Sequence, residues 1–180
     1  MREALAMGAD EAILISGREF GGSDTWATSY IIATAIKKIP DYDIIFCGRQ
    51  AIDGDTAQVG PQIAEQLNIP QITYVQKLDI EGDKVIVQRQ LEDGYTVVEA
   101  KMPVLLTAIK ELNTPRYMTP KGIFEAYNKT VQVWGFNDVP VDAEKIGLKG
   151  SPTNVNRTFS PEAKAVSYTH LRAHETLMNL

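Results

Sequence analysis

The sequence has 180 residues, a hydrophobic content of 44% and a formal net charge of −5. This length suggests one domain, and the apolar content is sufficient for a buried core. The acidic balance argues against nucleic acid as a partner, and the absence of a long apolar run argues against a membrane span. A single cysteine provides neither a disulfide framework nor a metal cluster and fits a reducing compartment. We expect no signal peptide.

The first part of the sequence predicts alternating helices and strands. Residues 1–10 are typical of the end of a helix closed by Gly8, and residues 11–16 of a buried strand. A helix is predicted over residues 25–38, capped by Ser23 or Asp24, with Trp26 packing in its first turn, and a second strand over residues 42–46. This β-α-β-α order implies a parallel sheet with right-handed crossovers.

A loop of small and polar residues joins the second strand to a helix that starts near Pro61. Gly48, Gly54 and Gly60 allow sharp turns and a close approach of the backbone to a ligand. Thr56 is a candidate cap of the helix, and Pro61 suits a first helical turn. Free N–H groups and the helix dipole at such a position favour an anion.

Two carboxylates in this loop oppose an anion. Asp53 and Asp55 repel a phosphate unless their side chains turn toward loop N–H groups or ribose hydroxyls. The residues alone leave a phosphate site and a simple Gly/Asp-rich turn both open. Cys47, just before the loop, is interpreted as a core filler, because no histidine outside residues 166–180 is available to activate it.

The second part of the sequence predicts antiparallel strands. Strands are expected over residues 71–80, 84–91 and 96–108, with hairpin turns at residues 81–83 and 92–94. They would lie on the sheet edge or form a small protruding unit, and Met102-Pro103 introduces an apolar run at residues 104–106 that is a candidate to return to the main sheet. A loop held by two prolines follows at residues 110–122, then a helix from Ile123 and an apolar run at residues 131–134. Residues 138–165 are polar and Pro/Gly-punctuated, and we expect an extended arm.

The last residues have a different origin. Residues 166–176 resemble the translation of a sequencing-library adapter, so we exclude residues 166–180 from functional reasoning as a non-native tail. This exclusion removes His170 and His174, whose i,i+4 spacing would otherwise suggest half a metal site. No metal site and no catalytic Ser/His/Asp or Cys/His set is expected in the rest of the chain.

Four segments in order resemble the β subunit of electron transfer flavoproteins, at residues 2–10, 48–55, 115–117 and 150–153. The resemblance extends from Arg2 to about Pro161. It implies a Rossmann-like open, mainly parallel α/β sheet with added antiparallel strands. It also implies a nucleotide-binding domain over residues 1–135, whose first strands are missing here, and a partner-clasping arm over residues 136–165.

The resemblance implies an electron carrier rather than an enzyme, in the bacterial cytoplasm. An α subunit binds FAD, the β chain covers that flavin, and the β chain holds AMP or a second FAD mostly through backbone N–H groups. In electron-bifurcating members the second FAD takes a hydride from NADH, and residues 53–60 look more like those members. The implied nucleotide-binding residues are Gly48, Arg49, Gln50, Ala51, Ile52, Asp53, Gly54, Asp55, Thr56, Ala57, Gln58 and Val59.

Two further groups of residues follow from the same resemblance. Arg89 would approach the flavin between the subunits, and an exposed ion pair with Glu92 is the competing interpretation. The loop at residues 110–122 would dock an acyl-CoA dehydrogenase or a similar redox partner. The family often has a leucine where this chain has Pro120, so the apolar anchor is left open. The implied docking residues are Leu112, Pro115, Arg116, Tyr117 and Met118.

Two other functions remain open from the sequence. A stand-alone adenine-nucleotide-binding module of the stress-protein or ATP-pyrophosphatase type explains the loop, but it explains neither residues 115–117 nor the arm. The other is a non-functional fragment, because missing first strands would expose an unpaired sheet edge and remove one wall of the nucleotide site.

Overall fold

The computed structural model describes residues 1–160, and the predicted tail at 166–180 lies outside the described residues, as do residues 161–165 of the predicted arm. The elements in chain order are α1 (Arg2–Ala6), β1 (Ala12–Ile15), η1 (Arg18–Phe20), α2 (Thr25–Ile36), β2 (Ile44–Gly48), α3 (Val59–Leu67), β3 (Gln71–Glu81), β4 (Lys84–Leu91), β5 (Gly94–Lys101), β6 (Val104–Ala108), η2 (Lys110–Leu112), α4 (Pro120–Asn128), β7 (Val131–Trp134), η3 (Ala143–Lys145) and α5 (Gly147–Gly150).

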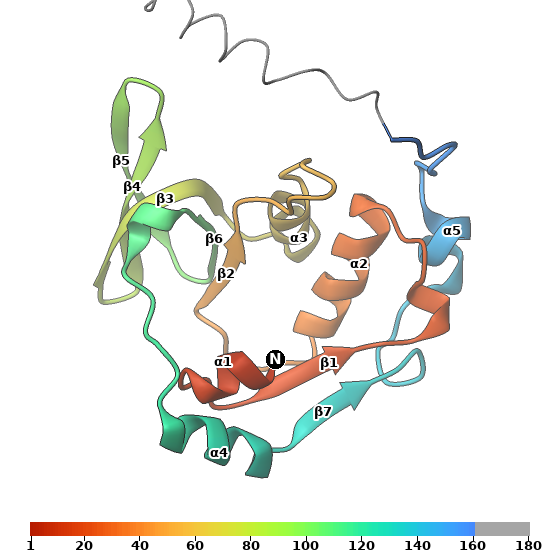
Figure 1. Ribbon diagram of the computed structural model, residues 1–180. Helices are drawn as coiled ribbons and strands as arrows, with labels where there is room; N and C mark the ends of the chain where they lie inside the picture. Colours follow the sequence, from red (N-terminus) through yellow and green to blue (C-terminus); the bar gives the residue numbers. More distant parts are fainter. Residues whose placement is uncertain (161–180) are drawn as a thin grey trace, which may run out of the picture.

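The strands form two sheets (Figure 1). The larger sheet has the order β2-β6-β3-β4-β5, in which β2, β6 and β3 are parallel and β4 and β5 continue antiparallel. The smaller sheet pairs β1 with β7 in parallel. The predicted α/β class with parallel and antiparallel strands is confirmed. The expected single sheet is instead two, because β1 and β2, which flank α2, pair with different neighbours.

The antiparallel part follows the predicted turns. Gly82 connects β3 to β4 and Gly94 starts β5, both with positive φ, which glycine adopts without strain. The strand expected over residues 96–108 is divided at Met102-Pro103, which ends β5. The apolar run that follows forms β6 between β2 and β3, so the expected return of this run to the main sheet is confirmed.

Strand β6 is the centre of the core, because its side chains alternate between two buried faces. Val104 and Leu106 pack with Val75, Val85 and neighbouring residues of β3 and β4. Leu105 faces the other way, against Ala33, Ile63 and Ala64 of α2 and α3. A third, smaller cluster joins α1 to α4 through Leu5, Ala6 and Ala126. No helix of the described residues has the length and apolar character needed to cross a membrane.

The N-terminus of α2 is fixed by a distant segment of the chain. Asp24 is the predicted cap and accepts a hydrogen bond at Oδ1 from the Ala27 amide at 3.0 Å. Its Oδ2 accepts from the Thr153 amide at 3.0 Å and from the Thr153 hydroxyl at 2.8 Å. The Asp24 amide donates to Ser151 Oγ at 2.9 Å. Residues 151–153, in the predicted arm, therefore contact the start of α2 in the same chain.

The titration of Asp24 reflects these contacts. Desolvation raises the pKa of its carboxyl, but the hydrogen bonds from Ala27 and Thr153 outweigh it, so the pKa lies below its ordinary value. Because the pKa is lower in the folded state, the ionised carboxylate stabilises the fold at pH values above the unfolded-state pKa. This stabilisation is lost as the pH falls through the folded-state pKa.

We therefore expect Asp24→Ala to lower the free energy of unfolding by about 1 kcal/mol at pH 7, the usual worth of a helix cap. The deficit relative to the unmodified chain should begin to shrink as the pH falls below about 4, the ordinary pKa of aspartate, and should disappear as it falls through the lower folded-state pKa. Urea unfolding at pH 7 and pH 3 measures both values. Asp24→Asn keeps a cap acceptor without the charge and serves as the control. An equal deficit for Asp24→Ala at both pH values would contradict the role of the carboxylate charge.

Candidate functional site

The loop between β2 and α3 lies at the carboxyl end of the parallel strands, where open α/β sheets bind ligands. Figure 1 shows it projecting beside the start of α3. Residues 50–56 are exposed, and Ile52 is fully exposed. The Asp55 amide donates to the Ala51 carbonyl at 3.1 Å, which closes one turn. Asp55 and Ala57 have φ of 52° and 54°, a conformation that non-glycine residues seldom adopt.

Helix α3 starts without a side-chain cap. Its N-cap residue is Gln58, which makes no capping hydrogen bond, so the prediction that Thr56 caps the helix is wrong. The reason is the backbone at Ala57, whose positive φ moves the helix start two residues beyond Thr56. Pro61 lies in the first turn, as predicted. Uncapped first-turn amides and the helix dipole make this end of α3 suitable for an anion.

Close packing places this helix end directly over the strands. A Cβ at Gly60 would lie 3.1 Å from Cγ2 of Thr107 in β6 and 3.3 Å from Cβ of Cys47 in β2. A side chain there would require Thr107 or Cys47 to shift by a few tenths of an ångström. Gly48 and Gly54 differ, because a Cβ there would meet no atom within 4 Å. Among the three loop glycines, close packing therefore favours glycine only at Gly60.

The two loop carboxylates are turned toward donors of the loop. Asp53 accepts from the Gly54 amide at 2.8 Å, as one of the predicted arrangements requires. Asp55 accepts from the side-chain amide of Gln50, and Gln50 Oε1 accepts from Arg49 Nε at 3.2 Å. Both carboxylates are therefore held by donors within the loop, and Arg49 belongs to the same hydrogen-bond network.

The other end of the loop contacts α2. The Thr25 hydroxyl donates to the Gln58 side chain at 3.0 Å. Trp26 stacks on Tyr30, with ring centroids 6.0 Å apart, which agrees with the predicted packing role. Cys47 packs in the cluster beneath α3, and burial raises the pKa of its thiol. A protonated, half-buried thiol is a core filler, as predicted, and a poor nucleophile.

Arg89 lies in β4, beside Val75 of β3 and Thr96 of β5. It is half-buried, and its Nε is buried with no hydrogen-bond partner within residues 1–160. The structure describes no ion pair between Arg89 and the exposed Glu92, so the competing interpretation of an exposed hairpin ion pair is not supported. A buried N–H without a hydrogen-bond partner is costly, so this atom lowers the stability of the chain as described.

The proline-held loop divides into a buried and an exposed part. Leu112 is half-buried and packs against the core cluster of β3, β4 and β6. Pro115 and Arg116 are exposed, and Tyr117 and Met118 are 93% and 41% exposed. Of the predicted docking residues, Leu112 therefore holds the loop in place, whereas Tyr117 and Met118 present apolar surface.

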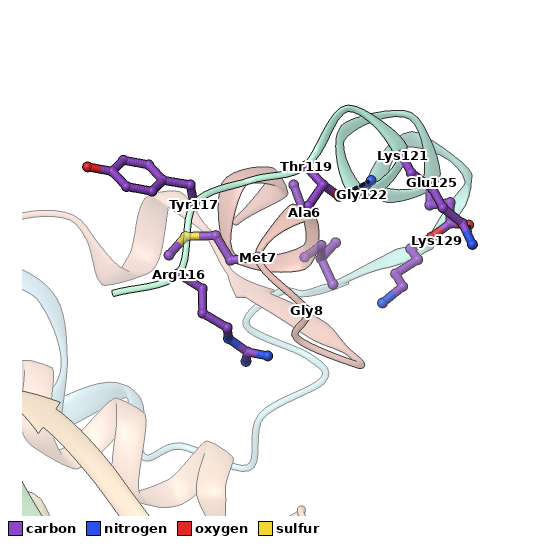
Figure 2. Close-up of a pocket in the computed structure, with 11 residues that line it drawn as sticks. Ala6, Met7, Gly8, Arg116, Tyr117, Thr119, Lys121, Gly122, Glu125 and Lys129 are labelled. Atoms are coloured by element: carbon purple, nitrogen blue, oxygen red, sulfur yellow. Dashed lines mark hydrogen bonds and ion pairs between the residues drawn. The ribbon is translucent and has the colours of Figure 1, made fainter. Parts of the chain in front are cut away.

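A hollow of about 320 Å³ lies between this loop, α1 and α4. Figure 2 shows Arg116 reaching toward the turn at Gly8, whereas Tyr117 points away from it. A Cβ at Gly8 would lie 3.7 Å from Arg116 Nη2, so this arginine packs on the end of α1. The hollow is separate from the loop after β2.

Two residues near the loop were not singled out from the sequence. Tyr74 lies under the Arg49 guanidinium, which is 5.3 Å from the ring centroid. The Thr107 hydroxyl accepts from the Tyr74 amide at 3.0 Å. Both residues occur within ordinary strand patterns, and no local sequence signal marks them.

The comparisons with known proteins agree with the resemblance. The model of the electron transfer flavoprotein domain matches residues 1–139. The electron transfer flavoprotein subunit beta of Thermoanaerobacterium thermosaccharolyticum is 64% identical over 165 residues, which cover 91% of this chain and 63% of the relative. The corresponding subunit of Clostridium acetobutylicum is 60% identical, covering 90% of this chain and 62% of the relative.

A relative with a more specific name is the caffeyl-CoA reductase-Etf complex subunit CarD of Acetobacterium woodii. It is 56% identical over 164 residues, which cover 91% of this chain and 63% of CarD. The chain thus spans slightly less than two thirds of the length of these relatives. The matched domain model and the identities together show that the chain belongs to the electron transfer flavoprotein family, as a β-subunit sequence.

Proposed function

We propose that the parent protein is the β subunit of a flavin-based electron carrier. With an α subunit it would shuttle electrons through FAD between dehydrogenases and an acceptor, in the bacterial cytoplasm. The proposal rests on the exposed loop after β2. This loop joins the carboxyl end of β2 to the uncapped end of α3, which packs on β2 and β6. The ligand proposed for this loop is AMP or the AMP part of a second FAD.

The loop's chemistry supports a phosphate ligand. The first-turn amides of α3 and the Arg49 cation provide positive potential, while Asp53 is satisfied by the Gly54 amide. The backbone at Gly48 and Gly54 is open to close approach, because no atom lies within 4 Å of a Cβ built there. Residues 48–59 would therefore hold the phosphates mostly through main-chain donors.

The flavin shared with the α subunit would supply the redox chemistry, and the chain's residues would position and cover it. The family resemblance assigns a flavin contact to Arg89, whose side chain is half-buried in β4. The described residues also contain no cluster of His, Cys, Asp and Glu suited to a metal.

The identity of the second nucleotide separates two kinds of carrier. A second FAD would make the protein electron-bifurcating, with NADH as the hydride donor, and residues 53–60 resemble that group. Relatives named as parts of CoA-ester reductases also support a flavoenzyme partner: CarD, and the acryloyl-CoA reductase electron transfer subunit gamma of Anaerotignum propionicum, which is 55% identical. We propose an acyl-CoA dehydrogenase or a similar enzyme as the redox partner.

The proposal also includes the domain organisation. We propose residues 1–135 as the nucleotide-binding domain and residues 136–165 as a segment that would clasp the partner. Within residues 1–160, β1 pairs with β7 and β2 pairs with β6, so each keeps one open edge. The relatives are longer than this chain, and we propose that further strands of the parent subunit occupy these edges.

We expect two adenine nucleotides per heterodimer when the full-length subunit is co-purified with its α subunit. Acid-released cofactors would be separated and counted. Two FAD without AMP would identify a bifurcating carrier, which NADH should reduce, whereas one FAD with one AMP would make the loop a structural clamp. One FAD and no second nucleotide would contradict the proposed loop function. A monomer that binds ATP would favour the stand-alone nucleotide-binding module.

Arg89→Met should have opposite effects on the isolated chain and on the assembled carrier. Removing a buried unpaired N–H should raise the free energy of unfolding of the chain by about 1 kcal/mol. Loss of the flavin contact should lower the FAD content of the heterodimer. Urea unfolding and the flavin absorbance per heterodimer measure the two effects. Arg89→Lys, which keeps the charge, is the control, and an unchanged FAD content in Arg89→Met would contradict the assignment.

Tyr117→Ala should raise the KM for the redox partner about tenfold, because an exposed aromatic side chain on a stiff loop is a typical binding hot spot. Steady-state electron transfer to the partner measures this effect, and flavin content and Tm should stay unchanged. The matched control is Leu112→Ala, which should lower the free energy of unfolding by about 2 kcal/mol through lost core packing. An unchanged KM in Tyr117→Ala would exclude Tyr117 from the docking surface.

A further inference from the structure

Strand β3 carries a bulge at Tyr74. Its register with β6 shifts between Ile72 and Val75, and its register with β4 shifts between Val75 and Lys77. Tyr74 has a φ of 57°, in the left-handed region that bulky residues rarely adopt. A bulge changes the direction in which a side chain leaves a strand, and such strain is characteristic of functional sites.

The bulge is held by one buried side chain. Thr107 in β6 is 2% exposed, and its hydroxyl accepts the hydrogen bond of the Tyr74 amide at 3.0 Å. The methyl group of the same residue lies 3.1 Å from where a Cβ at Gly60 would stand. Thr107 therefore contacts both the bulge and the first turn of α3, and it fixes one relative to the other.

The side chain that the bulge directs is in contact with the loop. The Tyr74 ring lies under the Arg49 guanidinium, 5.3 Å from its centroid, at a distance suited to a cation–π interaction. Arg49 Nε donates to Gln50 at 3.2 Å, and Gln50 in turn donates to Asp55. A line of contacts thus runs from buried Thr107 through Tyr74 to the charged residues of the exposed loop.

We propose that Thr107 and Tyr74 are positioning residues for the nucleotide phosphate. Thr107 holds the bulge through its hydrogen bond, the bulge directs the Tyr74 ring, and the ring holds the Arg49 guanidinium at the start of the loop. This inference rests on the proposed nucleotide-binding function of the loop and adds residues outside it. It implies that Tyr74 and Thr107 affect recognition of the phosphate and leave recognition of the nucleoside unchanged.

The test compares AMP with adenosine, because AMP is the group that both candidate ligands share. Equilibrium dialysis with the full-length subunit gives the Kd of each compound. Tyr74→Leu should raise the Kd of AMP about fivefold, as expected for a lost cation–π contact, and should leave that of adenosine unchanged. Thr107→Val, which loses the hydroxyl acceptor, should act in the same direction. Tyr74→Phe keeps the ring and Thr107→Ser keeps the hydroxyl. Both variants should therefore retain the original ratio of the AMP Kd to the adenosine Kd.

Arg49 supplies the decisive control. Arg49→Lys keeps a charge on an exposed side chain without the planar guanidinium, so it reports on the contact even if a β3 variant does not fold. Arg49→Lys should raise the ratio of the AMP Kd to the adenosine Kd, and adding Tyr74→Leu to it should have no further effect. Equal losses of affinity for AMP and for adenosine would overturn the inference, as would additive effects of the two substitutions on the Kd of AMP. If AMP binds tightly and Arg49→Lys leaves its Kd unchanged, the inference fails while the proposed function stands. If the unmodified subunit binds neither compound, both fail.

Discussion

The contact between the first turn of α3 and the ends of two strands determines the arrangement of the site. At Gly60 the helix backbone approaches Thr107 of β6 and Cys47 of β2 so closely that a Cβ would lie within 3.3 Å of both side chains. This contact brings the positive end of α3 to the carboxyl edge of the parallel strands. The loop between β2 and α3 cannot run beneath the helix at that distance, so it projects outward and leaves its main-chain donors exposed.

The same contact depends on β6, which follows the antiparallel strands β4 and β5 in the sequence. Leu105 of β6 supports α2 and α3 on one face, while Val104 and Leu106 support β3 and β4 on the other. The next residue, Thr107, accepts a hydrogen bond from the backbone of the β3 bulge. Strand β6 therefore contributes both to the packing of the core and to the geometry of the site. Substitutions near its carboxyl end should affect ligand recognition more than those near its start.

Local signals predicted much of this structure, and long-range pairing accounts for what they missed. Gly8, Asp24 and the hairpin glycines act through the backbone of neighbouring residues, so their roles follow from the sequence. Thr56 failed as a cap because the positive φ at Ala57 delays the helix, and no residue type indicates that conformation there. The division into two sheets, the bulge at Tyr74 and the unpaired Nε of Arg89 depend on which strands become neighbours. The loop itself was found through a composition of glycine and aspartate together with its family resemblance.

We propose that the loop after β2 and the first turn of α3 bind the phosphate of an adenine nucleotide. Backbone amide chemical shifts of the ¹⁵N-labelled full-length subunit, mapped during titration with AMP, test this binding site. We expect the largest shifts on residues 48–60, and adenosine should leave the amides of Val59 and Gly60 almost unchanged. Shifts concentrated instead around Arg116 and Lys129, at the hollow beside α4, would contradict it.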